Sequence, residues 1–576
     1  MAIQSSVGGA NRTVLNNKTW NFDNGGGTLT FNNGNHLFQG FLGSFHNFNV
    51  TAAGSGSSIT SINGGFMNMQ GSGNIEFDIA DGAEDRDLTL SATWSNGLLT
   101  KDGAGTLAIT GSHGGNYNID INAGTLEVGD AATLAGGTFT AAIANDGTYK
   151  HNSSANQTLS GVISGSGAVI KDNTGTLTLS GLVANTYSGG TTINDGIVSL
   201  GTGGAVVTSH QDALGTGSVT VNSGGELRLW IENSGTYTID NAITLDGGTV
   251  HGEDGIYDLT GGMTLNAGGG TLSGKWIDKG LNVSGTISGT GALTIDEVAG
   301  GSGSEVTLSG TNTFSGNVAV NNGTLVTSGS SGRLGANTAG RTVTVDGATS
   351  VLDVASTNSI VANHSTENDI TLVAQNGGTI RNSGGALNRI GDVTLDGGDL
   401  EANVDNVNWG SWYFGTRNGG QDATVSVSGS AASTISGTGN IALGANTQFN
   451  VADATGDAAT DLTVSAILAT GAASGHTGGF TKLGAGTMEL TGVNTYTGDT
   501  TISAGTLEIG GAGQLGSGSY AGAISNSGIF EYNSSAAQTL SGVISGAGSV
   551  LKDNTGTLTL TANNNFSGGT TVDGGT

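Results

Sequence analysis

Carboxylate side chains are the groups in this sequence whose chemistry is easiest to recognise. Cleavage of a glycosidic bond needs two carboxyl groups, one of which protonates the leaving oxygen. The densest group of candidates comprises Asp246, His251, Glu253, Asp254 and Asp258. However, the segment Thr-Leu-Asp-Gly-Gly at 244–248 recurs at 394–398, which indicates that Asp246 is a turn residue bonded to local backbone. We therefore expect no enzyme, and a polysaccharide-cleaving activity is the weaker alternative.

A second acidic segment, residues 81–87, reads Asp-Gly-Ala-Glu-Asp-Arg-Asp and could present carboxylates to calcium. Its spacing is not that of an EF-hand loop, and a solvated acidic loop is the favoured alternative. The eight histidines show no metal-type spacing, and the chain has no cysteine to assist them. We expect no catalytic residue, no cofactor and no metal, with calcium as the alternative.

Aromatic residues gather among polar ones at Trp409, Trp412, Tyr413 and Phe414, with Arg417 nearby. Such rings could stack on sugar rings or on another protein. Burial against a neighbouring part of the fold explains the cluster equally well, so both interpretations stay open.

The charge balance limits the partners. The chain has 45 acidic and 16 basic residues and a net charge of -29, so a phosphate backbone or an anionic membrane surface would repel it. No apolar run of about 18 residues could span a bilayer, and the first residues lack the pattern of an export signal. We expect no nucleic-acid partner and no membrane insertion in this portion.

The elements that must position these residues are strands. The chain has 107 Gly and no Pro, as expected where most strands lie between other strands and cannot lose a backbone donor. Segments 106–110, 176–180 and 557–561 place apolar residues at every second position, the period of a half-buried strand. This ordered alternation argues against disorder.

Internal repetition sets the architecture. Residues 151–165 match 532–546, so blocks near 98–201 and 479–576 are duplicates. On a shorter scale, a lysine, a turn and a Thr-Leu strand recur, and a fainter copy of the strand and its continuation spans 306–325. The lysines of this motif are Lys101, Lys171, Lys482 and Lys552. Equivalent strand positions return after about 20 residues, which predicts an all-β solenoid, a parallel β-helix of three short strands per coil.

The best copy, residues 176–196, follows the pattern G-T-L-x-L-S-G-x-N-T-Y-S-G-G-T-T-I-x-x-G. It resembles the passenger-associated strand repeat of autotransporter proteins. The resemblance implies a right-handed β-helical passenger that is exported across an outer membrane and displayed outside, commonly as an adhesin. It also implies that this chain is at most the passenger portion.

We divide the chain into four segments. Residues 1–96 hold eight of the 15 Phe and are expected to form a cap or head of the β-helix. Residues 97–205 are the first strand-repeat block, 206–478 are divergent coils, and 479–576 are the second block, which ends within a coil.

The expected function is that of a non-catalytic structural or adhesive rod, displayed on or released from a bacterial surface. Its partners would be glycans or proteins of host or neighbouring cells, or copies of itself. An alternative is a subunit of an extracellular filament or biofilm that assembles head to tail. The residues expected to mediate that end-to-end assembly are Asp573, Gly574, Gly575 and Thr576.

Overall fold

The computed structural model describes much of the chain, with its side chains from residue 75 onward except those of 94–95. The described residues are 2–4, 19–22, 28–32, 35–38, 47–52, 57–62, 66–69, 74–95, 97–179, 184–201, 212–230, 236–275, 280–297, 303–329, 333–360, 369–385, 388–405, 410–415, 423–445, 447–457, 459–471 and 478–576.

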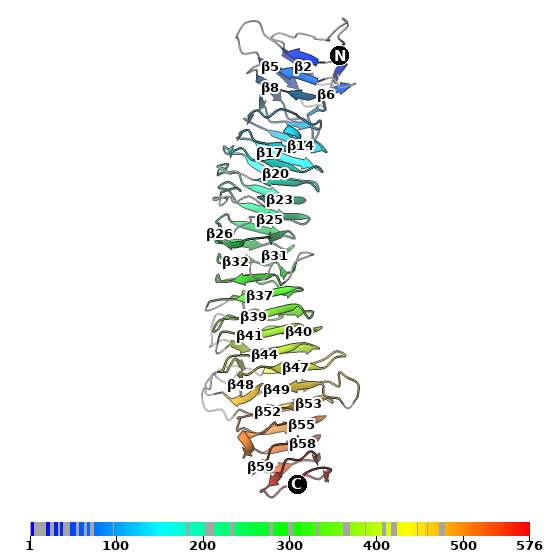
Figure 1. Ribbon diagram of the computed structural model, residues 1–576, viewed down its shortest axis with the longest axis vertical. Helices are drawn as coiled ribbons and strands as arrows, with labels where there is room; N and C mark the ends of the chain where they lie inside the picture. The colour runs from blue at the N-terminus through cyan, green and yellow to red at the C-terminus, as the bar shows by residue number, and fades with distance from the viewer. Residues whose placement is uncertain are drawn as a thin grey trace. The chain divides into compact units, whose positions relative to one another are not determined.

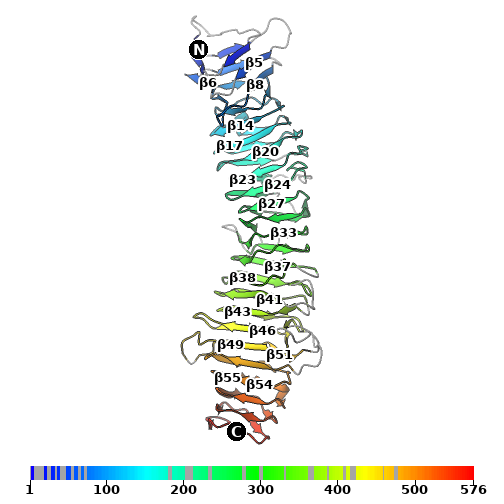
Figure 2. The same cartoon turned by 180° about the vertical axis from the view of Figure 1, so that it is seen from behind.

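The chain divides into two compact units, Met1–Thr271 and Leu272–Thr576. Each unit is a stack of coils in which short strands of one coil lie beside those of the next (Figure 1). The view from behind shows the same stacking on the opposite side of each unit (Figure 2).

In the first unit, long ladders of strands run from coil to coil. One ladder contains β1 (Ala2–Gln4), β3 (Thr28–Asn32), β6 (Ser57–Ile62), β9 (Leu88–Leu90), β12 (Thr106–Ile109), β14 (Thr125–Asp130), β17 (Thr148–Ser153), β20 (Ala168–Lys171), β22 (Thr191–Ile193), β24 (Val219–Asn222), β27 (Ile243–Asp246) and β30 (Met263–Leu265). A second contains β2 (Thr19–Phe22), β5 (Asn47–Ala52), β8 (Asn74–Ile79), β11 (Leu98–Asp102), β13 (Ile119–Ile121), β16 (Ile143–Asn145) and β19 (Ile163–Ser164). A third contains β15 (Thr138–Phe139), β18 (Gln157–Leu159), β21 (Thr176–Leu179), β23 (Gly196–Leu200), β25 (Gly225–Leu229) and β28 (Thr249–Gly252). Shorter ladders contain β4 (Asn35–Phe38), β7 (Phe66–Met69) and β10 (Thr93–Ser95), and β26 (Thr236–Ile239) and β29 (Ile256–Leu259).

The second unit has the same construction. One ladder contains β34 (Leu293–Ile295), β36 (Val318–Val320), β38 (Arg341–Asp346), β40 (Ile370–Gln375), β43 (Asp392–Asp396), β46 (Ala423–Val427), β49 (Thr447–Val451), β52 (Phe480–Leu483), β54 (Thr500–Ile502), β57 (Ile524–Asn526) and β60 (Ile544–Ser545). Another contains β32 (Leu281–Val283), β35 (Glu305–Leu308), β37 (Gly323–Thr327), β39 (Ser350–Val354), β41 (Thr379–Asn382), β44 (Asp399–Ala402), β47 (Ser433–Ser436), β50 (Leu462–Val464), β53 (Thr487–Leu490), β55 (Thr506–Gly511), β58 (Ile529–Ser534), β61 (Ser549–Lys552) and β63 (Thr570–Val572).

Shorter ladders of the second unit contain β42 (Asn388–Ile390), β45 (Trp412–Phe414), β48 (Asn440–Leu443) and β51 (Ile467–Thr470), and β56 (Ser519–Tyr520), β59 (Gln538–Leu540) and β62 (Leu558–Leu560). The remaining elements are β31 (Gly270–Gly274), β33 (Ile287–Gly289) and two single 3-10 turns, η1 (Ala135–Gly137) and η2 (Gly516–Gly518).

Strands of successive coils pair in parallel, as β12 does with β9 and with β14. The predicted all-β parallel solenoid is therefore confirmed in each unit. Leu107 pairs with Leu126 and Tyr149 with Val169, spacings of 126 − 107 = 19 and 169 − 149 = 20 residues. The predicted coil of about 20 residues thus holds within the repeat blocks.

Outside the repeats the predicted coil length is wrong. Val393 pairs with Val425 and Phe449 with Lys482, spacings of 425 − 393 = 32 and 482 − 449 = 33 residues. The extra residues fall between strands, where they lengthen the connections without shifting the register of the ladders.

The core follows from the alternation seen in the sequence. In β12 and β14 the inward side chains Leu107, Ile109, Leu126 and Val128 are fully buried. Each stacks on its counterpart in the next coil, and burial of one such side chain is worth about 1.5–3 kcal/mol. In the second unit an aromatic file continues this core. Its members Phe449, Phe480, Tyr496 and Tyr520 have successive ring centroids 5.3, 5.5 and 5.5 Å apart.

The aromatic start of the chain also contains solenoid strands, since β3 pairs in parallel with β1 and β6. Phe77, on β8, is fully buried. The side chains of the other aromatic residues that distinguish this segment lie outside the described residues. A role as cap or head stays a prediction.

Close coil stacking predicts a steric test at Gly175, which precedes β21. A Cβ at this position would lie 2.4 Å from the carbonyl oxygen of Ser153 and 2.5 Å from that of Ala155, both in the preceding coil. We expect Gly175→Ala to lower the free energy of unfolding of the first unit by about 1–3 kcal/mol through overpacking. Urea titration, with hydrogen exchange of β18 and β21, measures the change.

Gly114 is the matched control, because a Cβ there meets nothing within 4 Å. Gly114→Ala should change stability by less than about 0.5 kcal/mol. Equal losses in the two variants would contradict the packing argument.

Candidate functional site: the lysine corners and their outer faces

The four lysines of the repeated motif point into the solenoid. Lys101, Lys171 and Lys482 are fully buried, and Lys552 is 3% exposed. Each lies at or near the end of a strand, two residues after an inward apolar side chain such as Val169 before Lys171. The strand period therefore directs the lysine inward at a corner of the coil.

At the corner, the lysine ammonium group caps backbone carbonyls. Nζ of Lys171 donates to the carbonyl oxygens of Asp172 at 2.8 Å, of Asn173, and of Asp195 in the next coil at 3.1 Å. Nζ of Lys482 donates in the same way to Leu483 at 3.1 Å, Gly484 at 2.9 Å and Ala504 at 3.1 Å. Three donors thus meet three acceptors, which satisfies the buried ammonium group.

Burial lowers the pKa of Lys101, Lys171 and Lys482 to about 8. At pH 7 the protonated form still predominates, so each group remains a triple donor. A saturated, buried ammonium group is a structural clamp between coils, and it is not available as a nucleophile.

The turn after each lysine explains the rest of the motif. The second residue after the lysine has a left-handed backbone, with φ of 63° at Asn173 and 74° at Gly103. This conformation favours Gly and Asn, and it belongs to the turn whose carbonyls accept from Nζ.

Two buried aspartates complete the first corner of each block, and the sequence analysis missed them. Oδ1 of Asp461 accepts from the N–H groups of Ala454 at 2.8 Å and Thr455 at 2.9 Å, and Oδ2 accepts from Thr487 at 2.8 Å. Burial raises the pKa of Asp461, but these backbone donors outweigh it, so the pKa lies below its usual value.

Asp87 has the same role in the first unit, where it accepts from Gly82 at 2.9 Å and Thr106 at 2.8 Å. The recurrence of Asp-Leu-Thr at 87–89 and 461–463 was the signal that could have identified both.

The asparagine of the repeat links three coils. Oδ1 of Asn185 accepts from the N–H of Ile163 at 2.8 Å, while its Nδ2 donates to the carbonyl of Ala213 at 2.7 Å. Asn494 makes the corresponding bonds to Leu468 and Gln514. A side-chain amide here replaces the backbone pairing that a strand would provide.

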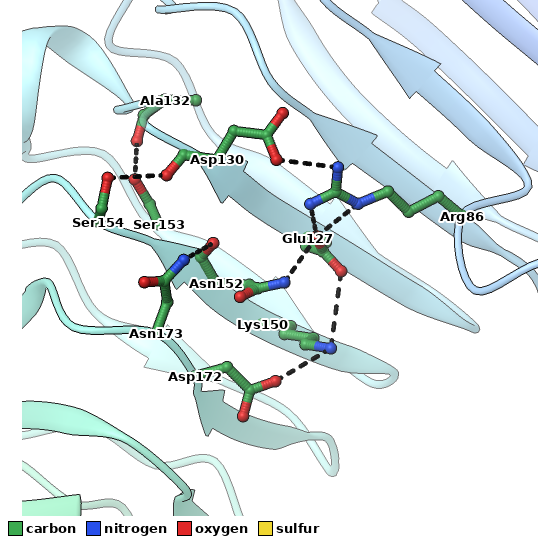
Figure 3. Close-up of polar contacts among 10 residues, drawn as sticks. All are labelled: Arg86, Glu127, Asp130, Ala132, Lys150, Asn152, Ser153, Ser154, Asp172 and Asn173. Atoms are coloured by element: carbon green, nitrogen blue, oxygen red, sulfur yellow. Dashed lines mark hydrogen bonds and ion pairs between the residues drawn. The ribbon is translucent and has the colours of Figure 1, made fainter. Parts of the chain in front are cut away.

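The outer face of the first block carries alternating charges from separate coils (Figure 3). Arg86 pairs with Glu127 at 2.5 Å and with Asp130 at 3.0 Å. Lys150 pairs with Asp172 at 3.0 Å and lies 3.6 Å from Glu127. Basic and acidic groups therefore alternate along the stack and neutralise one another.

The candidate carboxylates of an enzyme lie on different ladders. Asp246 ends β27, and its Oδ1 accepts from the N–H of Gly268 at 2.8 Å, which confirms the turn interpretation. His251 is on β28 and Asp258 on β29. The remaining two have structural contacts, Glu253 lying 3.7 Å from Arg228 and Asp254 accepting from Nε1 of Trp230 at 3.2 Å.

The aromatic cluster is buried. Trp412 and Tyr413 are fully buried, and Phe414 is 1% exposed. Nε1 of Trp412 donates to the carbonyl of Glu401 at 2.9 Å, and Phe414 packs edge-on against Phe449. Ligand contact through these three rings is therefore a wrong prediction, because β45 lies between β42 and β48 and its rings belong to the core of the second unit. Trp409 lies outside the described residues.

The acidic loop at 81–87 contributes Arg86 and Asp87 to the contacts given above, while Asp81, Glu84 and Asp85 are exposed. Within the described ranges, no group of three or more His, Cys, Asp or Glu residues could hold a metal ion. Calcium binding stays a prediction. In the same part of the chain, no helix is long and apolar enough to cross a membrane.

The residues expected to mediate end-to-end assembly lie in the last turn. The N–H of Asp573 donates to the carbonyl of Lys552 at 2.9 Å, and the carbonyl of Thr576 accepts from Leu558 at 2.8 Å. Gly574 contributes the third carbonyl of the Lys552 clamp at 3.1 Å, and Gly575 has a φ of 65°. Their role in assembly stays a prediction.

Comparison with known families places names on the lysine corners. Segments 99–128, 169–200, 303–326, 480–509 and 550–576 match the passenger-associated-transport-repeat family. The chain carries five passenger-associated-transport-repeats. Four of them contain a buried lysine as their third residue, and the fifth, at 303–326, coincides with the fainter copy found in the sequence. The predicted resemblance is confirmed.

A relative shares these features over most of the chain. The Adhesin BmaC autotransporter of Brucella suis biovar 1 (strain 1330) is 27% identical over 515 residues, which are 87% of this chain and 13% of that protein. The chain thus spans a small part of the length of the relative. No solved structure matches the chain.

The clamp predicts that Lys171 matters far more than its neighbour Lys150. Lys171→Met keeps the aliphatic stem but leaves three buried carbonyls without their donor, so we expect a loss of about 3–5 kcal/mol in the free energy of unfolding of the first unit. Lys150→Met removes half-exposed ion pairs and should cost no more than about 1 kcal/mol. Urea denaturation followed by circular dichroism compares the variants, and a loss from Lys150→Met as large as that from Lys171→Met would refute the clamp.

Proposed function

We propose that this chain is part of an autotransporter passenger that is displayed outside the bacterial cell, where it acts as a non-catalytic adhesive scaffold. The observation that carries the proposal is the coincidence of four transport repeats with buried lysine corners. A repeat of this kind is a passenger feature, and here its lysines, asparagines and turn residues are engaged in bonds between coils.

The same contacts support a scaffold in preference to an enzyme. The ionisable side chains that distinguish the repeats either cap backbone, as Lys171 and Asp461 do, or neutralise one another, as Arg86 and Glu127 do. The carboxylates that sequence alone offered for glycoside cleavage are spread over several ladders. What the repeats leave free is the outer surface of the coils and the long connections between strands.

Adhesion is the function in the printed name of the relative, the Adhesin BmaC autotransporter. For this chain, the partners we propose are glycans or proteins on host or neighbouring cells. Because the chain is strongly acidic, partners with basic or uncharged surfaces are favoured over anionic ones.

A binding experiment tests the adhesive role. Beads coated with the purified chain should bind host cells, bacterial cells or an immobilised glycan and matrix-protein array in a saturable manner. An excess of the soluble chain should compete, whereas an equally acidic unrelated protein should not. Failure to bind any of these surfaces would exclude the adhesive role as stated.

Two further measurements test the other parts of the proposal. Antibodies against the chain should label intact producing cells as strongly as permeabilised ones if the chain is displayed outside. Incubation with a polysaccharide panel should release no product. Depolymerisation that disappears in Glu253→Gln or Asp254→Asn would instead establish the enzyme alternative.

A further inference from the structure

The two repeat blocks are duplicates that differ at two adjacent positions with opposite chemistry. Residues 149–155 of the first block read Tyr-Lys-His-Asn-Ser-Ser-Ala, and residues 530–536 of the second read Phe-Glu-Tyr-Asn-Ser-Ser-Ala. Lys150 corresponds to Glu531 on the outer face. His151 corresponds to Tyr532 on the inner face.

On the outer face of the second block, three glutamates are in register. Glu489 of β53 pairs with Glu508 of β55, which pairs with Glu531 of β58. Neighbouring strands lie about 4.8 Å apart, so like charges are stacked directly against one another. In the first block, the position of Glu531 is occupied by Lys150, which lies between Glu127 and Asp172.

The groups that face Glu531 from the adjacent elements are acidic or apolar. Glu508 lies on β55, Leu551 is its partner on β61, and Asp553 follows that strand. Lys552 points inward to its three carbonyls. Among the described residues, no ion pair joins these glutamates to a basic side chain, and the polar contact of Glu508 is with Nδ2 of Asn533 at 2.7 Å.

Burial, together with the charges of Glu508 and Asp553, raises the pKa of Glu531 to about 7. Burial and the charge of Glu508 also raise the pKa of Glu489. The folded second block therefore holds a proton near neutral pH that the unfolded chain releases in mild acid.

On the inner face of the first block, His151 is fully buried in a stack with Val128 of β14 and Lys171 of β20. Its Nε2 lies 3.2 Å from the carbonyl oxygen of Ala155. Burial, and then the positive charge of Lys171, lower the pKa of His151 to about 4. Tyr532 makes the same contact in the second block, donating its hydroxyl to Ala536 at 2.9 Å, and it stays neutral at these pH values.

We propose that the two repeat blocks respond to pH in opposite directions, the first block loosening in acid through His151 and the second loosening above neutral pH through its stacked glutamates. The same solenoid frame would then open at different places in acidic and in alkaline surroundings.

The direction follows from proton linkage. The unfolded chain protonates His151 near pH 6.5 but the folded block only near pH 4, so the stability that neutral His151 confers is present above about pH 6.5 and lost as the pH falls toward 4. Glu531 behaves conversely. Its protonated form is favoured by the folded block, so that stability is present below about pH 4.5 and lost as the pH rises through about 7.

Hydrogen–deuterium exchange of the full chain, resolved by peptide, tests the proposal. Each variant is compared with the unchanged chain at the same pH, which cancels the intrinsic dependence of exchange on pH. Glu531→Gln should raise the protection of β55 and β58 about tenfold at pH 8 and far less at pH 5, since each unit of pKa shift is a tenfold change in the opening equilibrium. Glu531→Lys, which copies the first block, should act in the same direction.

His151→Tyr, which copies the second block, should raise the protection of β17 and β20 about tenfold at pH 5 and little at pH 8. Each variant also serves as the control for the other, because its effect should be confined to its own block. Equal effects at the two pH values would show that packing alone is altered. That result, or no effect at either pH, would overturn the proposal.

Discussion

The whole structure depends on the parallel register between coils, which places each side chain on its counterpart about 4.8 Å away. Whatever occupies an inward position must therefore tolerate a similar group above and below it. Leucine on leucine, as at Leu107 and Leu126, satisfies this at once and forms the core. A charged group satisfies it only where the chain itself supplies partners, and that condition explains the composition of the corners.

Corners are the costly part of such a coil because backbone carbonyls there leave the ladder and still need donors. Lys171 donates to carbonyls from two coils, Asp461 accepts from N–H groups, and Asn185 does both. The polar residues that make the repeats recognisable are thus engaged within the protein. Recognition of a partner then falls to outer faces and long connections, consistent with an adhesive scaffold.

Duplication of the repeat block shows how much freedom the outer face retains. Glu127 and Glu508 occupy equivalent positions, yet the first lies beside Arg86 and Lys150 and the second between two other glutamates. The ladders and the buried lysines are the same in both blocks. The frame is therefore indifferent to the charge it displays, while the local response to pH is not.

Sequence alone determined the strands, the parallel solenoid, the 20-residue coil of the repeat blocks and the turn role of Asp246, since each follows from alternation or recurrence over a few residues. It did not reveal that Lys101 and Lys171 are buried, because a lysine in a turn motif is normally solvated. The fate of residues 412–414 also needed the tertiary structure, because an aromatic strand can face either way. Arg86 and Glu127 are 41 residues apart, and only the register summed over coils of unequal length brings them together. Local patterns specify elements, whereas contacts between coils depend on every connection between them.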